Sequence, residues 1–235
     1  MHEVFIQSGL DMIFQLEQQC RQKWCPWVRE RGVISQAVYQ ATCDYIVAQS
    51  RGKTKHFDYG CGIYYKNKTN DPVLKTYDYL AYFSPVITNT FLEGRIVINR
   101  QDPSHPDKTY QNEINELLHE YGHWKSLIDW CIETNPVLTD DAALQTKSGY
   151  SHKIAEKYKD AENYDEYFIN ESRTIYMEEV YACKYALMTI DKLPISNVEK
   201  MVIAQYVKTR SIETLALYAK SIEKLLELEH KEKQK

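Results

Sequence analysis

The chain lacks the features that mark membrane, secreted and nucleic-acid-binding proteins. No apolar run approaches the ~20 residues that a membrane helix needs. Residues 1–10 include Glu3 and Gln7 in place of the basic region and apolar run of a signal peptide. Acidic residues (33) outnumber lysine and arginine (29), and the formal net charge of -4 argues against general nucleic-acid binding, which depends on neutralising phosphates. We therefore expect a cytoplasmic protein, of the producing cell or of a host, with no membrane partner.

Closely spaced cysteines are also missing. No two cysteines have the two-residue spacing of a zinc ribbon, since even Cys20 and Cys25 are further apart. Without a secretory signal, a reducing compartment favours free thiols over disulfides. We expect small, buried, reduced side chains at all six positions. These positions are Cys20, Cys25, Cys43, Cys61, Cys131 and Cys183.

Hydrophobic periodicity divides the chain into three parts. Residues 1–50 carry apolar side chains at helical spacing, and so do the residues after 109, apart from connectors near 134–151 and 191–196. The segment between them is rich in β-branched and aromatic residues, which predicts a small sheet. Its four short runs, separated by Asn-Asp-Pro, Ser-Pro and Glu-Gly, lie at 63–65, 79–83, 86–87 and 95–98.

This order of helices, small sheet, long helix, loop and helices predicts an α+β fold that is mostly helical. The length suits one main domain at 56–235 that is preceded by a helical region at 1–55 and packed with it as one compact unit. A capping box at Ser196 and Glu199 begins the last long helix. We interpret the apolar stripe of that helix as core or oligomer packing.

The strongest chemical signal is the segment 119–123, His-Glu-Tyr-Gly-His, within a helical pattern. His119 and His123 are four residues apart on one face with Cβ atoms roughly 6 Å apart, so two neutral imidazoles can reach one tetrahedral Zn²⁺. Glu120 lies one step around the same side, where it can act on a water at the metal without binding the metal. We interpret Gly122 as leaving room for a third ligand or for substrate.

A catalytic zinc needs a third protein ligand and an open position for water, and three residues are candidates. Asp129 would require a sharp turn after His123, but a helix that continues through Ser126 places it about 9 Å further along and ~120° away. Glu179 falls at the edge of a buried stripe, where a carboxylate is costly unless it is paired or bound to a metal. His152, in a polar connector, is the third option. We favour Glu179.

The helix that carries Glu179 has a face suited to close packing. Ala182 and Ala186 keep that face thin, and Glu178 lies on nearly the opposite side, where we expect it to be solvated. The alternative to metal binding is that Glu179 pairs with a cation such as Arg173. The stripe itself, at 4–3–4–3 spacing, is formed by Tyr176, Val180, Cys183, Leu187 and Ile190.

Two segments resemble the zincin-like metallopeptidases of the gluzincin type, typified by the ImmA/IrrE peptidases and the C-terminal domain of ArdC-type anti-restriction proteins. The resemblance covers roughly residues 94–190. In these families the second motif is a Glu three residues before an Ala, which falls on Glu179. The matching residues are Leu117-Leu118-His119-Glu120-Tyr121-Gly122-His123-Trp124 and Glu178-Glu179-Val180-Tyr181-Ala182 with Tyr185 and Ala186.

The resemblance implies a zincin-like fold in which a small twisted sheet packs on the metal-binding helix, with Zn²⁺ held by His119, His123 and Glu179. It also implies that a short strand, here 95–98, edges the substrate cleft. Two departures separate the chain from these families. The 55 residues between His123 and Glu179 are more than many such domains use, and neither a helix-turn-helix nor a single-stranded-DNA module accompanies the zincin.

These residues predict a zinc metallopeptidase that hydrolyses a protein or peptide substrate, with Glu120 as the general base and the substrate extended along strand 95–98. Tyr150, His152 and Tyr181 are candidate donors that would stabilise the transition state. One alternative is a zincin-fold interaction protein, anti-restriction or regulatory, whose metal site is structural or vestigial. The acidic balance and 19 tyrosines suit such a contact surface. A zinc hydrolase with a non-peptide substrate is the other.

Overall fold

A computed structural model describes residues 2–24, 34–67, 69–77, 80–88, 90–99, 110–138 and 164–233. The fold is α+β, about 68% helical with a small mixed four-stranded sheet, as the sequence predicts. No helix in the described ranges is long and apolar enough to cross a membrane. The helices are α1 (His2–Trp24), α2 (Gln36–Gln49), α3 (Pro72–Tyr77), α4 (Tyr110–Thr134), α6 (Tyr164–Lys192) and α7 (Asn197–Lys233). The strands are β1 (Gly52–Lys53), β2 (Asp58–Lys66), β3 (Ala81–Thr88) and β4 (Phe91–Asn99).

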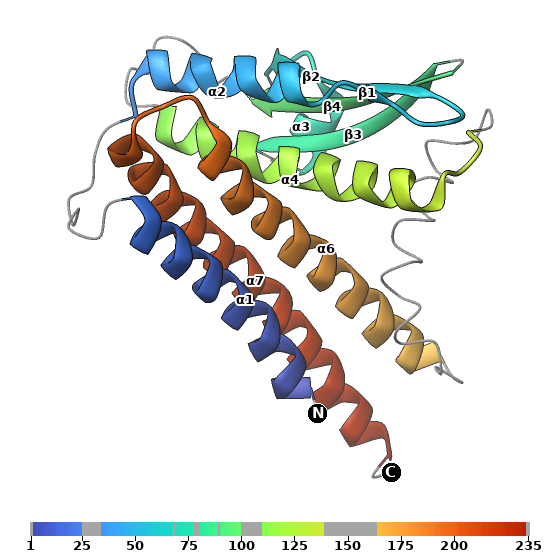
Figure 1. The fold of residues 1–235 in the computed structure, drawn as a ribbon. Coiled ribbons are helices and arrows are strands. Elements are labelled where there is room, and N and C mark those ends of the chain that lie inside the picture. The colour runs from blue at the N-terminus through green and yellow to red at the C-terminus, as the bar shows by residue number, and fades with distance from the viewer. Residues whose placement is uncertain are drawn as a thin grey trace.

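The order of the strands determines which of them lie at the edges of the sheet. The sheet has the order β1-β2-β4-β3. β4 pairs in parallel with β2 and antiparallel with β3, so it lies inside the sheet with both edges hydrogen-bonded. The strand expected to edge a cleft, 95–98, belongs to β4, so that prediction is wrong. The edge strand next to the helices is β3, and α4 packs against it (Figure 1).

β3 and β4 are longer than the sequence suggests, because two expected breaks lie inside them. Asn99 N–H donates to the Leu80 carbonyl. The backbone N–H and C=O groups of even-numbered β3 residues therefore point toward β4, and those of odd-numbered residues point to the free edge of the sheet. Pro85 is odd-numbered, and its missing N–H therefore costs no ladder hydrogen bond. Gly94 is required within β4, because a Cβ there would lie 2.4 Å from the ring of the fully buried Trp124.

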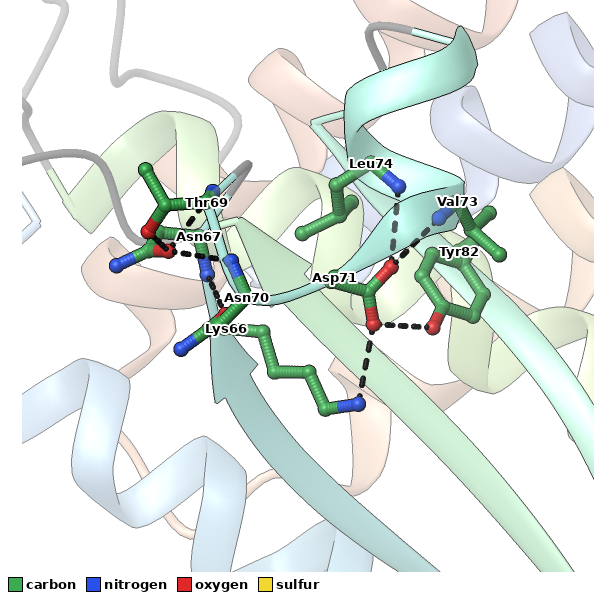
Figure 2. Close-up of polar contacts among 8 residues, drawn as sticks. All are labelled: Lys66, Asn67, Thr69, Asn70, Asp71, Val73, Leu74 and Tyr82. Carbon is green, nitrogen blue, oxygen red and sulfur yellow. Dashed lines mark hydrogen bonds and ion pairs between the residues drawn. The ribbon is translucent and has the colours of Figure 1, made fainter.

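A buried carboxylate anchors the beginning of β3 (Figure 2). Asp71, 3% exposed, accepts hydrogen bonds from the backbone N–H groups of Val73 and Leu74 in the first turn of α3. Its other oxygen accepts from the Tyr82 hydroxyl at 2.9 Å and pairs with Lys66 Nζ at 3.0 Å. Asp71 thus joins the end of β2, the start of α3 and the edge strand, and these charged and hydrogen-bonded partners lower its pKa although burial alone would raise it.

The remaining helices form a second body beneath the sheet. Figure 1 shows α1, α6 and α7 side by side, with both chain termini at one end. The Glu17 carboxylate of α1 pairs with Lys208 of α7 at 3.0 Å, and Tyr176 of α6 donates its hydroxyl proton to the Ile6 carbonyl. α2, by contrast, packs on β2 and α4. The two helices of region 1–55 therefore lie against different parts of the molecule.

Candidate metal centre

The two histidines of segment 119–123 lie on one face of α4, as their spacing predicts. Their ring centroids are 4.9 Å apart with the rings nearly perpendicular. The helix continues without interruption through Ser126 to Thr134. Asp129 therefore points elsewhere. Its carboxylate accepts a hydrogen bond from the Tyr185 hydroxyl at 2.5 Å and lies 3.5 Å from Lys125 Nζ.

Glu179 of α6 completes a three-residue cluster with the histidines. One carboxylate oxygen lies 3.0 Å from His119 Nε2, the other lies 3.7 Å from His123 Nε2, and the three ligand atoms are all within 4.8 Å of one another. Ligands at about 2.0–2.1 Å from a tetrahedral Zn²⁺ are about 3.3–3.4 Å from each other. The two Glu179–histidine separations lie on either side of that value but involve different carboxylate oxygens, and any ligand atoms as far apart as 4.8 Å would have to move closer to bind one zinc ion.

Gly122 has a different role from the one expected. A Cβ at this position would lie 2.1 Å from the Ala182 carbonyl oxygen, so the glycine permits contact between the backbones of α4 and α6. It does not leave space for a ligand or substrate, and that interpretation is wrong. The close crossing brings Glu179, one turn before Ala182, to the histidines. Ala182 and Ala186 are fully buried, as expected for a thin packing face.

The electrostatics of the metal-free cluster couple His119 to Glu179. Burial would lower the pKa of His119, but hydrogen bonds with the Cys183 thiol and with Glu179 raise it well above its ordinary value. Burial would raise the pKa of Glu179, but the hydrogen bond from His119 and the charge of His123 lower it. Both shifts favour the charged forms of the pair, a His119 imidazolium facing a Glu179 carboxylate.

Cys183 supplies a contact behind the cluster that cysteine counting does not reveal. Its sulfur lies 3.9 Å from His119 Nδ1, the ring nitrogen that does not face Glu179. Contacts of this kind fix the orientation and tautomer of a metal-binding histidine. In the described parts of the chain, Cys43, Cys61, Cys131 and Cys183 are buried free thiols as predicted, Cys20 is free but only partly buried, and Cys25 lies outside them.

Glu120 is buried beside the cluster without joining it. Glu120 is only 8% exposed, and this burial is the main reason that the pKa of its carboxyl rises to about 7. The charges of Glu116 and Glu179 act in the same direction, whereas His119 opposes them. The backbone of Phe83 on β3 has the last and smallest effect, and it acts to lower the pKa of Glu120.

A cavity of about 390 Å³, called the cleft below, opens over the cluster. β3 contributes one wall, α4 and α6 contribute the three cluster residues and Glu120, and α7 contributes a further wall. Its apolar lining lies mainly on β3. The lining residues are Leu80, Ala81, Tyr82, Phe83, Pro85, Glu116, His119, Glu120, His123, Leu127, Glu178, Glu179, Arg210, Thr214 and Tyr218.

The other predicted site residues have mixed outcomes. Glu178 lines the cleft and is partly buried, so the expectation of a solvated neighbour on the opposite side is wrong. Tyr181 is not among the described residues that line the cleft, and Lys184 Nζ lies 5.7 Å from the centre of its ring. Tyr150 and His152 lie outside the described residues.

Three cleft residues on α7 were not predicted. Arg210, Thr214 and Tyr218 follow one another at four-residue intervals, which places them on one helical face. The sequence signal for these cleft residues was their polar repeat beside the apolar stripe of the helix. Only the packing of α7 against α4 and α6 shows that the repeat faces the cleft.

Comparison with protein-family models, curated proteins and solved structures finds no match to this chain. The side chains of the cleft are therefore the basis for a functional assignment. They comprise a buried carboxyl of raised pKa, a set of imidazole and carboxylate ligands suited to a divalent metal, and an open space above them. This combination is suited to metal-assisted hydrolysis.

Proposed function

We propose that this chain is a zinc-dependent metallopeptidase of the zincin type, similar to gluzincins, that hydrolyses peptide bonds of a protein substrate. The observation that carries the proposal is the convergence of His119, His123 and Glu179 in an open cleft with Glu120 buried beside them. A structural zinc site is normally closed by four protein ligands. Three ligands in a cleft favour a catalytic site over a structural or vestigial one.

Zinc is the cofactor that this donor set suits best. Two imidazole nitrogens and one carboxylate oxygen are the ligands of many hydrolytic zinc sites, whereas magnesium and calcium prefer oxygen ligands alone. When bound, the ion would supply a Lewis acid that polarises the peptide carbonyl and acidifies water. His119 would bind through Nε2, with Nδ1 held by the Cys183 sulfur.

Glu120 would be the general base and then the general acid. A carboxyl with a pKa of about 7 can accept a proton from water and return it at neutral pH. The proton taken from water would pass to the nitrogen of the leaving amine.

The free edge of β3 would hold the substrate in an extended conformation. Odd-numbered residues point their backbone groups to this edge, where Pro85 has no N–H. A peptide would therefore pair with the carbonyl oxygens of Ala81, Phe83 and Pro85 and with the N–H groups of Ala81 and Phe83. The missing N–H of Pro85 would also limit unspecific pairing of this edge with other strands.

The test compares Glu120→Gln with wild type and with Glu178→Gln, which removes a second cleft carboxylate with no part in the reaction. We expect all three proteins to bind one zinc ion by metal analysis. Wild type and Glu178→Gln should cleave members of a peptide library, read by mass spectrometry, and Glu120→Gln should not. Unchanged cleavage by Glu120→Gln would reject the mechanism, and a wild-type protein that retains no zinc would reject the metal site.

A further inference from the structure

Among the described residues, one permanently charged cation faces the carboxylates of the cleft. Arg210 of α7 is the one lysine or arginine among the described residues that line it. Four glutamates, including Glu120 and Glu179, line the same space. An arginine is always protonated, so it provides a permanent positive charge whatever the pH of the assay. A permanent cation in a predominantly acidic cleft is suited to binding a negatively charged oxygen that appears there.

The guanidinium of Arg210 is held from one side and open on the other. Its Nε donates to the buried Glu116 carboxylate at 3.1 Å, and the arginine side chain is still 41% exposed. Because the pairing engages Nε, the N–H donors of the two Nη groups are available to a bound molecule. A guanidinium fixed by a carboxylate pays less entropy on binding than a mobile one.

Arg210 lines the same cleft as the three residues of the metal cluster. Tyr218, two helical turns or about 12 Å further along α7, also lines the cleft. As a neutral donor it would form weaker hydrogen bonds to an anion than a guanidinium does. Arg210 is therefore the strongest donor toward developing negative charge.

We propose that Arg210 stabilises the oxyanion that forms on the scissile carbonyl, and that Glu116 is its positioning residue. In the addition step, the oxygen of water bonds to the carbonyl carbon, the carbonyl π pair moves to oxygen and the water proton moves to Glu120. Arg210 donates a hydrogen bond to that negatively charged oxygen. When the carbon–nitrogen bond breaks, the pair on oxygen re-forms the carbonyl and Glu120 protonates the leaving amine. This inference rests on the proposed function.

The first experiment needs no substrate. Cobalt(II) replaces zinc, because its visible spectrum responds to a new ligand, and inorganic phosphate serves as the tetrahedral oxyanion. Arg210→Met should weaken phosphate binding roughly tenfold or more. Lys220→Met is the matched control, since Lys220 is an exposed cation of α7 that does not line the cleft, and it should bind phosphate like wild type.

The Glu116→Gln variant tests the positioning role. It should weaken phosphate binding less than Arg210→Met, and the double variant should match Arg210→Met alone, because Glu116 acts through Arg210. Additive losses would overturn the positioning role. Arg210→Lys keeps the charge but lacks the second donor group, so it should fall between wild type and Arg210→Met. This conservative variant also guards against a general folding defect.

The kinetic experiment separates this inference from the proposed function. On a cleaved peptide, Arg210→Met should lower kcat by about 100-fold with KM changed by less than about threefold. Normal cobalt spectra and normal peptide cleavage with no effect of Arg210→Met would overturn the inference and leave the peptidase intact. A wild type that binds no cobalt would overturn both. A defect confined to KM, and abolished when the peptide carries a C-terminal amide, would assign Arg210 to a substrate carboxylate and overturn the oxyanion role.

Discussion

Replacing Gly122 with alanine should separate the stability of the fold from the assembly of the metal site. The new Cβ would lie 2.1 Å from the Ala182 carbonyl oxygen and 2.7 Å from its carbonyl carbon, and both are backbone atoms that no rotamer change can move. Ordinary contacts begin near 3.4 Å, so α4 and α6 would have to separate by about 1.3 Å. Glu179 moves with α6.

The expected magnitudes differ for the two properties. Overpacking costs about 1–3 kcal/mol, but alanine in a helix gains about 1 kcal/mol over glycine, so metal-free Gly122→Ala should lose only about 0–2 kcal/mol of unfolding free energy. Metal ligands tolerate displacements of about 0.2 Å. A shift of Glu179 several times larger should weaken zinc binding by ~100-fold or more.

Denaturant unfolding of the metal-free protein and a zinc titration against a chromophoric chelator measure the two effects. Gly9→Ala of α1 is the control, because its Cβ would meet the side chain of Tyr176 at 2.7 Å and not a backbone atom. It should lose stability while zinc affinity stays within about threefold of wild type. Wild-type zinc affinity in Gly122→Ala would refute the reasoning that this close crossing positions Glu179.

Two further predictions concern buried carboxyl groups. In the metal-free protein the pKa of Glu120 is about 7, against 4.5 for an exposed glutamate, so its contribution to stability is present below pH 4.5 and lost as the pH rises through 7. Metal-free Glu120→Gln should therefore gain up to about 3 kcal/mol on wild type between pH 4.5 and 8 in denaturant unfolding, and parallel pH profiles would contradict this. Asp71→Asn should cost about 3 kcal/mol, because the ionised carboxylate is buried with Lys66 and Tyr82 as partners. Asp58→Asn, an exposed carboxylate paired with a lysine, should cost less than about 1 kcal/mol by the same measurement, and equal losses would show that the Asp71 contacts contribute little.

Sequence periodicity predicted the local parts of the candidate site. The spacing of His119 and His123 fixes both imidazoles to one face of α4, because a helix repeats every 3.6 residues whatever surrounds it. The same reasoning separated Asp129 from the histidines and placed Glu179 at the edge of a buried stripe, where the structure has it. These predictions needed only the geometry of a single helix.

Contacts between elements required the tertiary structure. Which strand forms the free edge depends on how β2 and β3 pair with β4, and two apolar strands of similar composition give no sequence signal for that choice. The sequence suggested that Gly122 leaves space for a ligand, yet the glycine permits a backbone contact with α6, a helix that begins 42 residues later. Arg210 enters the cleft only because α7 packs back against α4 and α6. Helical periodicity determines which side chains share a face, whereas long-range packing of many weak contacts determines which faces meet.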